Sequence, residues 1–302
     1  MLQGLAGRRL DGASSRVRDR PMEVSSMRRE ELEFGQEREA LAFLEREPVR
    51  NLRMVWALRR WGLFNLGLAE QGRYLAARGR EGIRGMLMLN NQGMLRVAAR
   101  GDVARELVER ALSSWGIPEV LAGPEEEIEE ILGAVKELME AVEHREEEVS
   151  LALSARDFAP LRGWAEAAGE EDLDCLVDLE RMLQEELLGS IAETWVIRLQ
   201  LRRALEDGTA ALVRHAGRAV SKAEIEAATP RADELGGVYT VPDHRRRGFA
   251  AAACSLVCES SLMLGKTVRL ETQRDNAAAV SLYRNLGFRE LWPHLAVRFR
   301  RE

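Results

Sequence analysis

The segment 234–264 constrains the fold more strongly than any other part of this 302-residue chain. It begins with a mostly apolar stretch that predicts a strand, and Pro242 begins a turn after it. Three consecutive arginines, Arg245-Arg246-Arg247, then lead to Gly248 and to a long helix that we expect over 251–264. Free N–H groups at a helix N-terminus, with guanidinium groups beside them, bind anionic phosphate groups. The segment therefore predicts a strand, a turn and a helix with a phosphate site in the loop.

A second strand and helix follow directly. Residues 267–272 alternate between apolar and polar, which is typical of a strand, and a turn leads into a helix that we expect over 277–286. Gly287 stands where a helix C-terminus favours glycine. In the first strand, the pair Gly236-Gly237 weakens the strand interior, so we expect a bulge there or the close approach of another backbone.

These residues resemble, in order and spacing, two signatures of the GNAT superfamily of N-acetyltransferases. The loop Arg245-x-x-Gly248-x-Ala250 resembles the loop that binds the pyrophosphate of acetyl-CoA. The second signature is matched at Asp275, Asn276, Tyr283, Gly287 and Phe288. The resemblance covers about the last half of the chain. It implies an α+β (mixed α/β) fold, with a GNAT-type twisted mixed sheet flanked by helices.

The first half shows a similar order of elements. We expect helices over 37–47 and 49–61, then three strands, a helix, a strand and a Glu-rich helix, within 74–78, 83–89, 93–99, 102–114, 119–122 and 125–148. This order resembles a second GNAT-like half, as in the tandem branch of the superfamily. In the corresponding loop Gly101 takes the place of the central glycine, but Ala98 and Val103 depart from the pattern and Asp102 would repel phosphates. An unrelated α+β domain is equally compatible with the pattern alone.

We therefore expect three regions. Residues 1–29 are predicted to be a mobile tail, 30–147 a degenerate GNAT-like domain, and 148–302 the catalytic GNAT domain. The catalytic domain is expected to open with a strand over 149–155 and a helix entered from 157–161. A periodic helix over 191–205 and a hairpin of 210–215 with 218–227 should then precede the central strand.

Composition narrows the classes of partner and compartment. The net charge of −6 argues against a nucleic-acid binder, and no run of about twenty apolar residues is present to span a membrane. Cys254 and Cys258 lie one helical turn apart and are expected to be reduced core residues of a cytoplasmic protein. We expect no metal, because metal-ligand spacing is absent among His144, His215, His244 and His294.

The resemblance also implies roles for individual residues. The pyrophosphate of acetyl-CoA would be held by Arg245, Arg246, Arg247, Gly248, Phe249 and Ala250. Its pantetheine arm would pair with the backbone of Val238, Tyr239 and Thr240, as an added strand does, with Asn276 as a further anchor. Tyr283 lies seven residues after Asn276, about 10 Å further along the same helix face, and would protonate the leaving thiolate. Without the motif, a core aromatic would be the better interpretation of Tyr283.

The general base is the least defined part of the site. Glu234 is at the position on the central strand where some family members carry their base, although others deprotonate the amine through water. Other acidic strand residues that could face the substrate are Glu224, Glu226 and Glu271.

The leading hypothesis is an acetyl-CoA-dependent N-acetyltransferase that transfers the acetyl group directly to a primary amine of a small molecule or peptide. The alternative is a non-catalytic acyl-CoA-binding or interaction module. A third interpretation, an aminoacyl-transferring relative, is opposed by the acidic balance and the intact CoA loop. The acceptor amine, the acyl length and the existence of a homodimer stay open.

Overall fold

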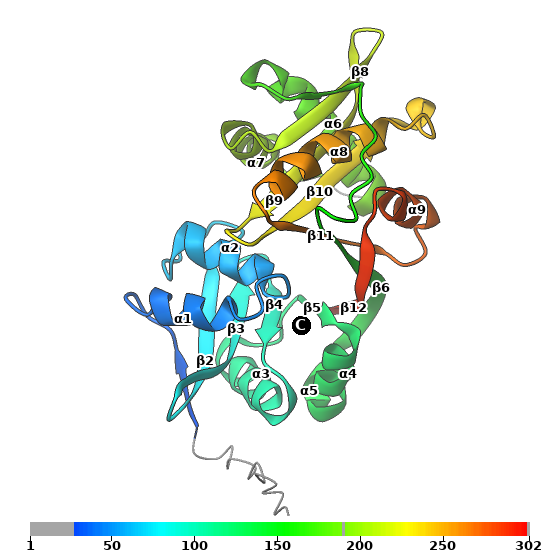
Figure 1. Ribbon diagram of the computed structural model, residues 1–302. Helices are drawn as coiled ribbons and strands as arrows, with labels where there is room; N and C mark the ends of the chain where they lie inside the picture. The colour runs from blue at the N-terminus through cyan, green and yellow to red at the C-terminus, as the bar shows by residue number, and fades with distance from the viewer. Residues whose placement is uncertain (1–26, 189–190, 301–302) are drawn as a thin grey trace, which may run out of the picture.

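The computed structural model describes residues 27–188 and 191–300. The predicted tail over 1–26 lies outside these residues, whereas Arg28 and Arg29, which we also assigned to the tail, pair with a neighbouring strand. One mixed sheet runs through both halves of the described chain, in the order β1-β2-β3-β4-β5-β12-β6-β11-β10-β9-β8-β7 (Figure 1). The strands are Arg28–Glu31 (β1), Gly72–Gly79 (β2), Gly82–Asn90 (β3), Met94–Ala98 (β4), Val120–Pro124 (β5), Val142–Leu153 (β6), Ala165–Ala167 (β7), Ala210–His215 (β8), Arg218–Ala228 (β9), Ala232–Thr240 (β10), Thr267–Gln273 (β11) and Arg289–Phe299 (β12).

Helices flank this sheet, which confirms the predicted mixed α/β class. They are Glu37–Leu44 (α1), Leu52–Trp61 (α2), Gly101–Trp115 (α3), Glu125–Ala134 (α4), Lys136–Ala141 (α5), Leu173–Leu188 (α6), Thr194–Glu206 (α7), Phe249–Met263 (α8) and Ala277–Asn285 (α9). Each half contains one parallel strand pair joined by a helix, namely β4-α3-β5 and β10-α8-β11. The same unit is therefore built twice along the chain.

Strands β6 and β12 hold the two halves together (Figure 1). β12 follows the whole second half in sequence, yet it pairs with β5 of the first half from His294 to Arg298. On its other side it pairs with β6 from Arg289 to Phe299. The predicted boundary between residues 147 and 148 falls inside β6, so the strand contributes to both halves.

The structure departs from the sequence prediction in three segments. The single helix expected over 125–148 is divided at Val135, whose backbone is extended, and its last part is strand β6. Pairing of β6 with β12 overrides the helix propensity of the glutamates there. No helix begins near 157–161, and α6 was not predicted, although the spacing of Leu173, Leu176 and Val177 is helical.

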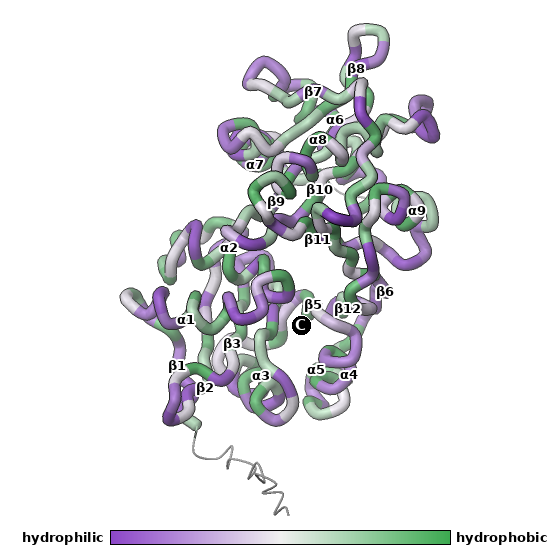
Figure 2. The backbone as a smooth tube through the Cα atoms, in the orientation of Figure 1, coloured by the Kyte–Doolittle hydropathy of each residue, from purple (hydrophilic) through white to green (hydrophobic). Residues whose placement is uncertain are grey.

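Helix α8 packs on the sheet of the second half through an almost entirely apolar surface. Ala252, Ala253, Cys254, Val257 and Cys258 of α8 lie in one buried cluster with side chains of β6, β9, β10 and β11. Figure 2 shows hydrophobic residues concentrated in such central elements and hydrophilic residues in the outer loops. Small residues at these positions let α8 approach the sheet closely. The start of the helix is thereby fixed relative to β10.

Candidate active site

The site begins where β10 and β11 separate. The two strands pair in parallel only from Ala232 to Glu234 of β10, opposite Thr267 to Arg269 of β11. β11 then stays paired with β6 as far as Gln273, while β10 continues to Thr240 along β9. Beyond Glu234 the edge of β10 that faces β11 therefore has no strand partner among the described residues. An extended ligand could pair with the backbone there.

A bulge interrupts β10 at the mouth of this opening, as the two glycines predicted. The pairing register with β9 shifts between Gly236 and Tyr239, and Gly237 has φ +56°. A Cβ on Gly237 would lie 2.7 Å from Nζ of Lys222 and would also clash with the carboxylate of Glu224. The ends of two β9 side chains thus lie against the bulge, and the positive φ of Gly237 favours glycine there.

The N-terminus of α8 lies at the end of the same strand. Gly248 is the residue before the helix, with φ +84°, and no side chain caps this end of the helix. The first N–H groups of the helix thus have no side-chain acceptor among the described residues, which an anion site needs, and the side chains of Leu161 and Trp164 pack against Gly248.

The three arginines of this loop differ in their contacts. Arg245 donates to the carbonyl oxygen of Thr240 at 2.9 Å and pairs with Glu186 of α6 at 2.6 Å. Within the ranges 27–188 and 191–300, Arg246 and Arg247 form no ion pair. Their guanidinium groups can therefore bind phosphates.

Tyr283 of α9 lies in the core of the second half. Its side chain is 7% exposed, and its ring centroid is 5.6 Å from that of Phe288. Burial, followed by the nearby Cys254, Cys258 and Glu226, raises the pKa of Tyr283 well above its ordinary value. The phenol is therefore protonated at neutral pH and can donate a proton. Its burial is equally typical of a core aromatic.

Asn276 begins α9 and caps it. Its side-chain oxygen accepts a hydrogen bond from the N–H of Ala279 at 3.1 Å. The side chain is exposed, so its amide N–H₂ group stays available to a ligand.

Among the cysteines, burial raises the pKa of Cys254 to about 12, which fits the predicted role of a small core residue.

Comparison with known proteins bears on the fold that carries this site. The family model described as FR47-like protein matches residues 216–297. A GNAT-family acetyltransferase from Colwellia psychrerythraea is similar in structure with TM-score 0.61 at 15% identity, covering 90% of this chain and all (100%) of that one. A tandem GNAT protein from the clavulanic acid biosynthesis pathway gives TM-score 0.58 at 14% identity, with 91% and 99% of the two chains covered. The chain has the GNAT fold.

The tandem form of the GNAT fold accounts for both halves, because these matches extend over nearly the whole chain. A GCN5-related N-acetyltransferase from Sphaerobacter thermophilus is similar over 90% of this chain and 95% of its own, with TM-score 0.60 and 15% identity. No curated protein matches the sequence. In the described part of the chain, every helix is too short or too polar to cross a membrane.

Glu234, the first candidate for the base in this GNAT fold, does not suit that role. Its carboxylate accepts hydrogen bonds from Nε of Arg53 and from a terminal nitrogen of Arg269, each at 2.9 Å. Burial alone would raise the pKa of Glu234, but Arg53 and Arg269 outweigh it and lower the pKa to about 2. A base needs a free lone pair and a pKa closer to neutrality. The sequence could not show these partners, because Arg53 lies in the other half.

Glu224 has the raised pKa that Glu234 lacks. Burial raises the pKa of Glu224, with Lys222 opposing and Glu226 reinforcing the shift. Its carboxylate lies 3.2 Å from Nζ of Lys222 and directly against the bulge at Gly237. Two candidates remain: Glu226 forms an ion pair with Arg53, and Glu271 has a lowered pKa, because Arg269 and His294 outweigh the effect of its burial. Glu224 is therefore the candidate base that the geometry favours.

Proposed function

We propose that this protein is an acetyl-CoA-dependent N-acetyltransferase that transfers an acetyl group directly to the primary amine of a small molecule or peptide. The observation that carries the proposal is the opening between β10 and β11 beside the uncapped start of α8. The unpaired edge of β10 suits the amides of a pantetheine arm, and the free N–H groups of 248–250 suit a pyrophosphate. The donor supplies an acetyl thioester, whose carbonyl carbon is the electrophile.

We assign a residue of this chain to each step of the transfer. Arg246 and Arg247 would bind the phosphates, with Arg245 joining them on release from Glu186. A backbone N–H of the bulge, near Val238, would polarise the acetyl carbonyl. Glu224 would take one proton from the ammonium, and the resulting amine would attack the carbonyl carbon and form the C–N bond. Tyr283 would give its proton to the thiolate as the C–S bond breaks, and the second proton that the nitrogen loses would return to Tyr283 through solvent.

We assign catalysis to the second half, 148–302, and treat 30–147 as its degenerate counterpart. In the first half the corresponding helix, α3, has Asp102 in its first turn and Arg100 just before it. Arg100 pairs with Glu47 and Glu127, and the added carboxylates make this helix start unfavourable for phosphates. The free thiols of Cys175, Cys254 and Cys258 support a reducing, cytoplasmic location.

Calorimetry with acetyl-CoA tests the proposal. Wild type should bind, and Gly248→Glu should not, because the new carboxylate would occupy the phosphate site. Gly116→Glu is the matched control, since exposed Gly116 has a similar φ of +82° and no atom within 4 Å of its Cβ position. Absence of binding to wild type, or equal binding by Gly248→Glu, would reject the cofactor assignment.

Thiol release with a panel of amines then separates the enzyme from its alternative. A non-catalytic acyl-CoA-binding module is compatible with Tyr283 as a core residue, and it would bind acetyl-CoA without releasing CoA for any amine or peptide. Amine-dependent release of CoA would exclude that alternative.

A further inference from the structure

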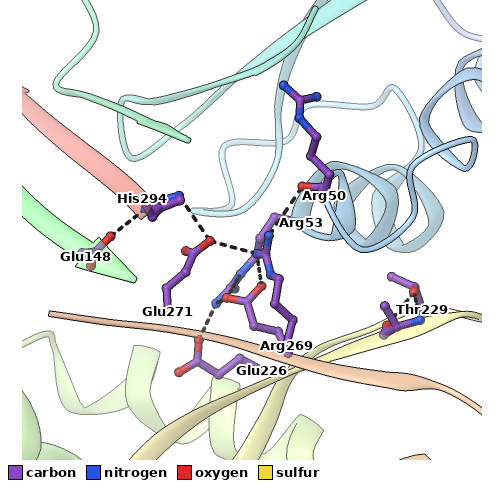
Figure 3. Close-up of polar contacts among 10 residues, drawn as sticks. Arg50, Arg53, Glu148, Glu226, Thr229, Arg269, Glu271 and His294 are labelled. Carbon is purple, nitrogen blue, oxygen red and sulfur yellow. Dashed lines mark hydrogen bonds and ion pairs between the residues drawn. The ribbon is translucent and has the colours of Figure 1, made fainter. Parts of the chain in front are cut away.

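A small cavity lies between the two halves, on the face of the sheet opposite α8. Arg269 of β11 points to this face, because its neighbours Val268 and Leu270 point into the cluster under α8. The cavity is lined by α2, β4, β5, β11 and β12, and its charged lining residues are Arg50, Arg53, Arg96, Arg269, Glu271 and His294. Figure 3 shows Arg53 of α2, Arg269 and Glu271 of β11, and His294 of β12 meeting there. The cavity is therefore formed only when both halves are assembled.

Most of the charged groups in this cavity have partners. Arg53 pairs with Glu226 and Glu234, and Arg269 lies 2.9 Å from Glu234 and 3.4 Å from Glu271. His294 lies between Glu148 at 2.9 Å and Glu271 at 3.2 Å.

Arg96 of β4 is the exception. No carboxylate of the described chain lies within ion-pair distance of its half-buried guanidinium. Burial, and then the charge of Arg53, lower the pKa of Arg96, while Glu271 and Glu234 compensate only in part. The cavity thus contains a positive charge that the protein itself does not neutralise.

Three buried N–H groups at the same cavity also lack an acceptor. These are Nε of Arg50, Nε of Arg269 and Nε1 of Trp292, none of which meets a hydrogen-bond acceptor within residues 27–188 and 191–300. Folded proteins seldom leave such donors unpaired, so their coincidence with Arg96 indicates a site for an acceptor group of negative charge.

We propose that this cavity binds a carboxylate group. The volume of the cavity that the centre of a water molecule can occupy is about 30 Å³. Since about 10–15 Å³ of such space holds one water, it accommodates about two waters or the two oxygens of one carboxylate. The planar fork of a guanidinium matches a carboxylate in geometry as well as in charge.

A cation is the less suitable occupant. Glu148, Glu271 and His294 could together offer three ligand atoms to one ion, since these atoms lie within 4.8 Å of one another. However, Arg269 is 3.4 Å from Glu271, and Arg53 and Arg96 line the same cavity. Their positive charges would oppose a metal ion and favour an anion.

Arg53 connects this cavity to the proposed acetyl-transfer site. Its guanidinium pairs with Glu226, whose carboxylate lies against Gly236 of the bulge. The carboxylate could belong to the amine acceptor, which rests on the proposed function, or to a separate small anion that stabilises the contact between the halves.

Thermal unfolding with acetate or propionate, at constant ionic strength against chloride, tests the site itself. The Tm of wild type should rise with carboxylate concentration, because a ligand of the native state stabilises it. Arg96→Gln should abolish the rise and Arg96→Lys should reduce it, whereas the exposed Arg80→Gln, a matched loss of charge, should keep it. An equal rise in Arg96→Gln or Arg96→Lys and wild type, or no rise beyond chloride in wild type, would overturn the proposal.

Enzyme kinetics distinguish whether the carboxylate belongs to the amine acceptor or to a separate small anion. An amino acid and its primary amide are compared as acceptors in the thiol-release assay. If the acceptor supplies the carboxylate, Arg96→Gln should raise KM about tenfold or more for the acid and leave the amide unchanged. If a separate anion binds, both acceptors should respond alike while the Tm effect persists. Failure of acetyl-CoA to bind would reject the proposed function without affecting the Tm result.

Discussion

Replacement of Glu234 by glutamine should destabilise the protein through the contact between its halves. The carboxylate is 6% exposed and is held by Arg53 from α2 and by Arg269 from β11. Its pKa falls from 4.5 to about 2 in the folded protein. At about 1.4 kcal/mol for each pKa unit, this difference corresponds to about 3 kcal/mol of folding free energy at pH 7. Loss of one partner from a buried ion pair has a cost of the same order.

The lowered pKa of Glu234 also determines the direction in which folding stability changes with pH. A carboxylate whose pKa is lowered by folding stabilises the native state above pH 4.5, and this contribution is lost as pH falls toward 2. Urea unfolding of wild type and Glu234→Gln should therefore differ by about 3 kcal/mol at pH 7 and by about 2 kcal/mol at pH 3.5. The exposed Glu81→Gln serves as control and should match wild type at both pH values. A Glu234→Gln variant within about 0.5 kcal/mol of wild type at pH 7 would refute the reasoning.

Three further predictions concern the proposed chemistry. Tyr283→Phe should retain acetyl-CoA binding by calorimetry and lower the rate of thiol release by about 100-fold, as loss of a general acid does; unchanged turnover would remove Tyr283 from the mechanism. Glu224→Gln should lower turnover to a similar extent. In wild type the acidic limb of the pH–rate profile should lie above 4.5, because burial raises the pKa of Glu224; a limb at or below that value would contradict its role. Glu186→Gln should strengthen acetyl-CoA binding by a few fold, since it frees Arg245 from an exposed ion pair whose contribution is about 1 kcal/mol or less; weaker binding would mean that the pair holds Arg245 in place for the phosphates.

Local patterns in the sequence predicted the parts of the site that are themselves local. The bulge at Gly236-Gly237, the start of α8 at Gly248 and the end of α9 at Gly287 each depend on neighbouring residues and on glycine conformations. These features were predicted correctly, and they position most of the candidate cofactor residues.

The remainder depends on contacts between distant segments. The ion pairs of Glu234 come from Arg53, 181 residues away, and no local pattern indicates them. Likewise, β6 became a strand because β12 is available to pair with it, although its sequence favours a helix. The fold class was therefore predictable from periodicity and motifs, whereas the choice among Glu224, Glu226, Glu234 and Glu271 required the assembled structure.

The position of β12 has a consequence for biosynthesis. Because this strand lies beside β5 and emerges from the ribosome after everything else described here, the earlier half exposes an unsatisfied sheet edge throughout translation. Co-translational maturation of that half must wait for the final segment, so a nascent polypeptide arrested before residue 289 would be a substrate for chaperones and proteases.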